Sequence, residues 1–497
     1  MKRFLPLIVS GIFLVYLVTA IVRPVGSTGG FDVAAFGRLP VLLNGRLQPL
    51  DSVARLALLQ IRGTVAVPLE KGTLDATVWL VELLMKPDAA DKRKIFLVRE
   101  PQVSSVLHRK PEASSGVVYY TYKELEPRLE DLTTQTRRIA SIKAADRAPW
   151  ERECLKLQNA LTTYERLKNS LQPNSTLQRE AGGKPIAYDF AARLARYQTD
   201  LRAGLEPAVV RERGNKQQLD PAVAKRIREF AEPYVGVSRT ALISMIPPTD
   251  PVRAYKWQNV GMAVVDGTRT GQLPPPLLRF AAMSSAVAHG KAADFDGEVA
   301  KYNQWLTARA FSAEVSKARS EYFFTHFQPF VRAAAIYLVA FILICASWVR
   351  RSTMLRQSAT ILVIVATVLH TTGLLFGMML EGRPPITNWY SLIILVGWMA
   401  AVAGLVAERY YRNGIGVLTT AAAGLAAMLA AYILPAGGAI ALIQAVLDRG
   451  FVLAALATAI VLSAGTLRGA AARLRLRRRR APRRAEAARV IGEALGD

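Results

Sequence analysis

One histidine stands inside a long apolar run of the sequence. His370 lies near the middle of the stretch 358–380, which holds no Asp, Glu, Lys or Arg. Because an ionisable residue is costly in such a run, it usually faces a bundle interior or a cavity. Its neutral imidazole could ligate a metal, and haem iron commonly takes an axial histidine. The alternative is a neutral histidine that forms a hydrogen bond across the bundle to a hydroxyl such as Thr367 or Thr371.

An arginine and two aromatic side chains follow that run. Arg383 comes soon after Leu380 and precedes the pair Trp389 and Tyr390. A guanidinium can pair with a carboxylate through two hydrogen bonds, and haem carries two propionates. The aromatic side chains suit an interfacial belt and could also stack on a porphyrin. On a helix, His370 would lie roughly 15 Å from Leu380, so one cofactor standing edge-up could touch both His370 and Arg383.

The other residues that could do chemistry have no suitable neighbours in the sequence. His108 and His289 have no spaced partner, and we expect surface or capping roles for both; His326 is also alone. The only cysteines are Cys154 and Cys345, which excludes a disulfide scaffold and a structural zinc cluster built from cysteine. No nucleophile elbow or phosphate-binding glycine loop is present.

The elements that position His370 and Arg383 are membrane spans. Six stretches are long and apolar enough to cross a bilayer: 4–22, 333–349, 358–380, 391–407, 415–434 and 451–467. We expect the first to be a retained anchor, because no clear cleavage site precedes Arg23 and Pro24. The fold class is therefore a mainly α multipass membrane protein.

Basic residues in the short loops predict the orientation of these spans. Lys2 with Arg3, the loop around Arg350, the loop around Arg409 and the C-terminal tail would all be cytoplasmic. The formal charge of +26 is thereby explained by topology and anionic lipid rather than by nucleic acid. The predicted parts are listed in chain order: an anchor at 1–23, an extracytoplasmic helical domain at 24–328, five spans within 329–467 and an arginine-rich tail at 468–497.

The sequence predicts that the large outer domain is mostly helical. Leucine and isoleucine spacing predicts a helical hairpin over 122–171 with a break at Pro149. Further helices are expected at 186–204, 219–232, 276–290 and 293–320, a strand at 95–98 and a loop at 173–185.

One stretch of this domain combines a turn with a helix start. Asn44-Gly45 is a tight-turn pair between two apolar runs, and Pro49 followed by Asp51 or Ser52 suits a helix start. Arg46 and Arg55 would flank that start. A hairpin that leads into a helix explains most of the pattern.

Three groups of residues resemble the System II cytochrome c biogenesis membrane proteins (CcsA/ResC type, fused CcsB-CcsA-like). The first is the stretch from Gly45-Arg46 through Pro49-Leu50-Asp51 to Ala54-Arg55, and the second is Glu321-Tyr322 with Gln328-Pro329-Phe330. The third and most specific runs from His370-Thr371-Thr372-Gly373-Leu374 to Gly382-Arg383-Pro384-Pro385 and Asn388-Trp389-Tyr390, with Trp398 beyond. A weaker match begins at Val446-Leu447-Asp448.

The likeness covers the front part of such a protein. The family's tryptophan-rich haem motif is absent, and Val452 and Leu456 stand where the family has tryptophan and histidine. A truncated gene, a split system completed by another chain and a paralogue with a different task are all consistent with this.

The resemblance implies a function. It implies a component of cytochrome c assembly in the cytoplasmic (inner) membrane that helps to deliver or hold haem for apocytochrome c, as part of a haem lyase together with another assembly subunit. Haem would be the cofactor, bound by His370 (at the iron), Arg383, Trp389 and Tyr390. The alternative is a non-catalytic, membrane-anchored scaffold that binds partner proteins. Nucleic acid is not an expected partner.

Overall fold

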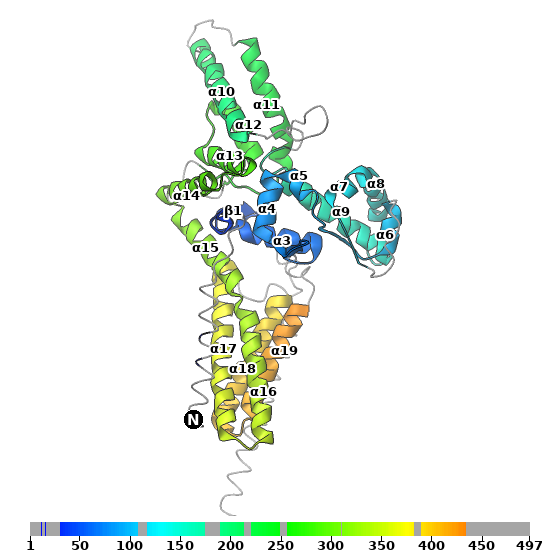
Figure 1. The fold of residues 1–497 in the computed structure, drawn as a ribbon, viewed down its shortest axis with the longest axis vertical. Helices are drawn as coiled ribbons and strands as arrows, with labels where there is room; N and C mark the ends of the chain where they lie inside the picture. Colours follow the sequence, from blue (N-terminus) through cyan, green and yellow to red (C-terminus); the bar gives the residue numbers. More distant parts are fainter. Residues whose placement is uncertain are drawn as a thin grey trace, which may run out of the picture. The chain divides into compact units, whose positions relative to one another are not determined.

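The protein is mainly helical and divides into two compact units (Figure 1). The computed structural model describes residues 30–107, 117–173, 189–212, 220–248, 256–309, 311–381 and 389–433, with Gly11 and Val15. One unit, here the outer unit, is Val25–Phe323, and the other, here the membrane unit, is Met1–Pro24 with Phe324–Asp497. The stretch 4–22 apart from Gly11 and Val15, the stretch 451–467, the loop 174–185, His108, Arg383 and the tail lie outside the described residues.

The first half of the outer unit combines short helices with three two-stranded antiparallel sheets. In chain order its elements are α2 Val33–Gly37, β1 Pro40–Leu43, β2 Arg46–Pro49, α3 Leu50–Arg62, β3 Ala66–Pro68, β4 Thr73–Asp75, α4 Ala76–Met85, α5 Pro87–Ala90, β5 Phe96–Val98, α6 Pro101–Val106, β6 Val118–Tyr120, α7 Tyr122–Leu125 and the 3-10 helix η2 Glu126–Arg128. The predicted strand at 95–98 is thus confirmed as β5.

The rest of the outer unit is helical. Its elements are α8 Leu129–Ala140, α9 Pro149–Lys168, α10 Phe190–Glu212, α11 Pro221–Thr240, α12 Val260–Thr270, α13 Pro275–Ala288, α14 Ala292–Ala308 and α15 Ser312–Phe327. α10 and α11 pack side by side, and α12 packs against α11 (Figure 1). The single helix expected at 293–320 is wrong: α14 ends at Ala308, and the buried Phe311 separates it from α15.

The predicted hairpin and helix start near residue 45 are confirmed. β1 and β2 pair antiparallel with Leu43 opposite Arg46. Asn44 and Gly45 both have positive φ, at 50° and 76°, as a tight hairpin turn requires. α3 begins directly after Pro49, whose fixed φ and extended ψ of 153° lead the strand into the helix.

Pro149 begins a helix rather than breaking one. α8 and α9 pack together as the predicted helical pair, but residues 141–148 already separate them. Proline suits the first helical position because its missing N–H would have no partner there. The Glu151 carboxylate accepts a hydrogen bond from the Ala148 N–H at 2.8 Å and caps the helix start.

A buried ion pair lies in the core of the outer unit. Lys168, 4% exposed, donates to Asp91 with 2.7 Å between Nζ and Oδ2, and the Tyr164 hydroxyl donates to the other carboxylate oxygen at 2.8 Å. Burial and the Asp91 charge raise the pKa of Tyr164 well above its ordinary value, so the hydroxyl keeps its proton and stays a donor. Tyr122 stacks on Tyr164 with ring centroids 5.0 Å apart.

Cys154 supplies a test of this core. Its side chain is fully buried in α9, and burial raises the pKa of the thiol to about 11. Thiolate is the reactive form, so roughly a thousandth of the thiol is reactive at pH 8. In the full chain carrying Cys345→Ala, we expect a maleimide reagent to leave Cys154 unlabelled until denaturant unfolds the outer unit. Rapid labelling without denaturant would contradict the buried placement.

The membrane unit is a bundle of four described helices (Figure 1): α16 Pro329–Val349, α17 Thr353–Glu381, α18 Trp389–Tyr411 and α19 Ile415–Ile433. Three described helices are long and apolar enough to cross a membrane, at Ser312–Val349, Thr353–Leu380 and Tyr390–Tyr411. They match three of the six predicted spans. The prediction at 415–434 corresponds to α19, whose apolar part Ile415–Ala431 is shorter.

Small residues let two of these helices approach closely. α16 packs against α17 and α19, and α18 packs along α19. A Cβ added at Gly404 would lie 2.5 Å from the Thr420 hydroxyl oxygen, and one at Gly397 would lie 2.1 Å from the Ala427 Cβ. Small-residue contacts of this kind are typical of helix packing in membranes.

Candidate functional site

His370 sits at the centre of a polar cluster within the membrane unit. Its ring is fully buried on α17, between Tyr337 on α16 and the backbone of Ile394 on α18. The Ile394 carbonyl can only accept, so the His370 Nε2–H donates to it, at 3.1 Å. Nδ1 then has a free lone pair, which faces the Tyr337 hydroxyl at 3.5 Å. The arrangement fixes one neutral tautomer.

The partners of His370 differ from those expected from the sequence. The sequence predicts, as one of two alternatives, a hydrogen-bonded histidine with a hydroxyl such as Thr367 or Thr371 as partner. Both threonine hydroxyls instead donate to backbone carbonyls four residues earlier in α17, each at 2.7 Å. Threonine in a helix commonly satisfies itself in this way. The Tyr337 hydroxyl lies 3.2 Å from the Thr367 oxygen, so its hydrogen serves either Thr367 or His370.

Aromatic side chains enclose the histidine ring. Phe330 and Tyr337 both meet it edge to face, with ring centroids 6.0 and 6.2 Å away. Trp398, four residues after Ile394 on α18, donates its indole N–H to the Thr371 oxygen at 2.8 Å. The cluster therefore links α16, α17 and α18 through side chains that all have partners.

In this arrangement, His370 is not placed to bind haem iron. A haem iron needs an exposed ring nitrogen with a free lone pair. Nε2 donates its proton to the Ile394 carbonyl, and Nδ1 faces the Tyr337 hydroxyl in a ring that is fully buried. Among the described residues, no group of three His, Cys, Asp or Glu side chains could hold a metal.

The other three predicted site residues are only partly placed. Arg383 lies outside the described residues, and Trp389 is the first residue of α18, with its side chain outside the described part. Tyr390 is half-buried and packs against the small apolar cluster of Leu374, Ile394, Met428 and Ala431. Tyr390 and His370 thus belong to neighbouring parts of the bundle, because Ile394 contributes to both.

A second polar cluster forms in the outer unit, from two stretches that carry the family resemblance. Glu321, only 4% exposed on α15, accepts from Arg46 of β2 at 2.9 Å and from the Ser52 hydroxyl of α3 at 2.8 Å. Arg46 also contacts the Gln48 side chain at 3.3 Å. The sequence singled out both stretches but not their pairing.

Asp51 is the buried centre of the same region. Its side chain is 1% exposed and accepts from Arg55 at 2.8 Å and from the Thr77 hydroxyl at 2.7 Å. Arg55 reaches Asp75 as well, at 3.6 Å. Because the charges have partners, these residues fix the hairpin, α3 and α4 against α15 rather than offering a free catalytic group.

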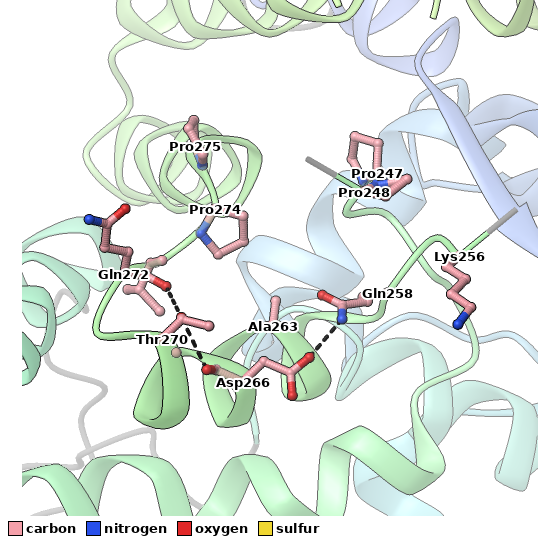
Figure 2. A pocket seen from close by; sticks show the side chains of 12 residues that line it. Pro247, Pro248, Lys256, Gln258, Ala263, Asp266, Thr270, Gln272, Pro274 and Pro275 are labelled. Atoms are coloured by element: carbon pink, nitrogen blue, oxygen red, sulfur yellow. Dashed lines mark hydrogen bonds between the residues drawn. The ribbon is translucent and has the colours of Figure 1, made fainter. Parts of the chain in front are cut away.

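A pocket of about 460 Å³ opens elsewhere in the outer unit, beside α12 and the start of α13 (Figure 2). Figure 2 shows two proline pairs facing it, at 247–248 and 274–275. Gln258 donates to the Asp266 carboxylate at 2.7 Å, and Lys256 is the other charged residue of the described lining. The described lining combines rigid proline rings with the hydrogen-bonded Gln258–Asp266 pair and Lys256, which suits binding. The proline pairs were the only sequence signal for it.

Of the described histidines, His289 behaves as expected. It is exposed, ends α13 and contacts the Ser285 carbonyl through Nδ1 at 2.7 Å, which is a capping role.

No protein-family model matches the chain, and no curated protein matches it. The functional assignment therefore depends on the motifs and on the two polar clusters.

Proposed function

We propose that the chain is a membrane component of System II cytochrome c assembly, helping to deliver or hold haem for apocytochrome c outside the cytoplasmic membrane. One observation carries the proposal: residues of separate resembling stretches meet in space. Arg46 and Glu321 are 275 positions apart and form an ion pair. Within the third group itself, Thr371 and Trp398 are 27 positions apart and form a hydrogen bond. Matches that also contact one another support a shared fold more strongly than scattered ones.

In this proposal the chain acts together with apocytochrome c and with another assembly subunit that carries the tryptophan-rich part. His370 is fully buried and its Nε2–H donates to the Ile394 carbonyl, so no haem step is assigned to it. Haem contact by Arg383, Trp389 and Tyr390 stays a prediction, whereas iron ligation by His370 is not proposed.

The second candidate is a non-catalytic scaffold outside cytochrome c assembly. The burial of His370, whose Nε2–H donates to the Ile394 carbonyl, and the paired charges around Asp51 favour it, because both clusters act as structural links. The two functions differ in one phenotype. Deleting the gene should remove or strongly reduce haem-stained c-type cytochromes in membranes if the assembly proposal holds, with recovery by the wild-type gene. Normal c-type cytochromes in the deletion strain would contradict the assembly function and favour the scaffold function.

Two His370 variants separate a structural histidine from an iron ligand. His370→Gln keeps a side-chain donor for the Ile394 carbonyl but removes the imidazole, whereas His370→Leu removes both. We expect His370→Gln to retain c-type cytochrome formation and His370→Leu to reduce it, as measured by haem staining. A Soret band in the purified wild type that disappears in His370→Gln would contradict this and support iron ligation.

The proposed topology has six spans, both termini in the cytoplasm and the outer unit on the far side. It is supported by the arginines in the two connections of the membrane unit, at 350–356 and 409–412. A phosphatase fused after Asp497 should be inactive, and a green fluorescent reporter there should fluoresce. Active phosphatase at that position would overturn the span count.

A further inference from the structure

Two connections of the membrane unit lie at one end of the bundle and, with the adjoining helix ends, carry five arginines. The first joins α16 to α17, and the second joins α18 to α19. Their arginines are Arg350, Arg351, Arg356, Arg409 and Arg412, of which all but the half-buried Arg356 are exposed. Here they are called the arginine surface.

The two connections form a single surface. The Arg356 guanidinium donates to the Arg412 carbonyl at 3.2 Å and so crosses from one connection to the other. A Cβ built at Gly414 would lie 3.2 Å from the Trp348 indole nitrogen and 3.5 Å from the Arg356 Cδ. The connections therefore pack against each other rather than standing apart.

The positive charge of this surface is not neutralised by the described residues around it. Glu408 is the only acidic residue within 350–360 or 401–416. Its carboxylate accepts from the N–H groups of Gly414, at 3.0 Å, and Gly416, at 3.1 Å, at the start of α19. Throughout the described ranges, none of the five arginines has an ion-pair partner. The arginine surface therefore has an excess of positive charge, which is suited to binding an anionic ligand.

Two of these arginines occupy backbone positions that favour glycine. Arg351 and Arg412 both have φ of 48°, in the left-handed region just beyond a helix end. Glycine is the usual residue there because a side chain is strained in this conformation. Gly414, two residues beyond Arg412, follows that rule with φ of 85°. Arginine therefore occupies two positions where the backbone conformation favours glycine, which indicates a functional role for the two side chains.

We propose that the arginine surface binds the phosphate headgroup of an anionic phospholipid. Guanidinium groups pair with phosphate through two hydrogen bonds, and basic residues near a bilayer attract anionic lipid. The neighbouring side chains suit that depth: Trp348 is 45% exposed and Tyr410 is 64% exposed, as in an aromatic interface belt. Ile342 and Val349 of α16 are also exposed and would meet acyl chains.

The test compares lipid retention by the full chain and a double variant. Arg351→Gly with Arg412→Gly removes both charges while easing the backbone, so loss of binding cannot be blamed on a strained turn. Arg196→Ala with Arg228→Ala is the charge-matched control, since both are exposed on helices of the outer unit. Each protein is purified in detergent, incubated with phosphatidylglycerol, phosphatidylcholine or inorganic phosphate, and assayed by native mass spectrometry and thermal melting.

We expect wild type and control to retain phosphatidylglycerol and to melt higher with it. The double glycine variant should bind it about tenfold more weakly or worse, since two arginines are lost, while melting no lower than wild type without lipid. Equal retention by the glycine variant would overturn the proposal, and so would equal retention of phosphatidylcholine. An equal rise in melting temperature with inorganic phosphate alone would also overturn it, in favour of a general anion site.

Discussion

Asp51→Ala should destabilise the outer unit by about 3 kcal/mol, because it leaves the partly buried Arg55 guanidinium without its main partner. The Asp51 side chain is 1% exposed, and that of its partner Arg55 is 17% exposed. The buried Thr77 hydroxyl loses its acceptor as well. Asp51→Asn keeps an oxygen for Thr77 but not the charge, so it should lie between wild type and Asp51→Ala.

Denaturant-dependent labelling of Cys154 measures this effect in the full chain. The midpoint of labelling should shift to lower denaturant in the order wild type, Asp51→Asn, Asp51→Ala. Glu229→Ala is the matched control, because Glu229 pairs with Lys225 at 3.8 Å with both side chains more than 60% exposed. Such a surface pair contributes roughly 0.5 kcal/mol or less. Equal midpoints for Asp51→Ala and Glu229→Ala would show that the Asp51 cluster contributes little to stability.

Gly404→Val should separate α18 from α19 and lower the melting temperature of the purified protein sharply. The added Cβ alone would lie 2.5 Å from the Thr420 hydroxyl and 2.9 Å from the Thr420 backbone nitrogen. Backbone cannot move aside as a flexible side chain can, so the expected loss is at the upper end of overpacking, about 3 kcal/mol. The hydrogen bond from Thr420 to the Ala401 carbonyl, at 3.0 Å, would break with it.

Gly377→Val is the control within the same unit. Nothing lies within 4 Å of a Cβ built at Gly377 on α17. It adds the same side chain to a helix of the same bundle and should leave the melting temperature nearly unchanged. If both variants melt alike, the close approach of α18 and α19 does not stabilise the bundle.

Local signals predicted the parts of the fold that local chemistry determines. Asn44-Gly45 fixed a tight turn and Pro49 a helix start, and both elements form where expected. Pro149 shows the limit of such reasoning, since the same ring that breaks a helix interior also suits a first turn. α12 was missed because Gly261 and Gly267 interrupt its sequence pattern. They fit there because α12 approaches α11 and Leu273 closely.

The two polar clusters could be predicted only in part. His370 stood out as an ionisable residue in an apolar run, but its partner Tyr337 carries no local signal within another such run. Its other partner, the Ile394 carbonyl, is a backbone group, so the residue type at position 394 does not predict the contact. The pairing of Arg46 with Glu321 depends on a contact across 275 positions that no periodicity encodes.

The pairing of Arg46 with Glu321 brings the two ends of the outer unit together. A Cβ on Gly37, near its start, would lie 3.4 Å from the Tyr322 ring at its end. Closing a chain segment of this length entropically costs roughly 5 kcal/mol, and contacts at the junction offset that loss. In topological terms the outer unit is an insertion whose described parts near its two ends, Gly37 and Tyr322, adjoin each other. Its natural ends could therefore be joined and new ones opened in the turn at 141–148, giving a circularly permuted domain with the same core.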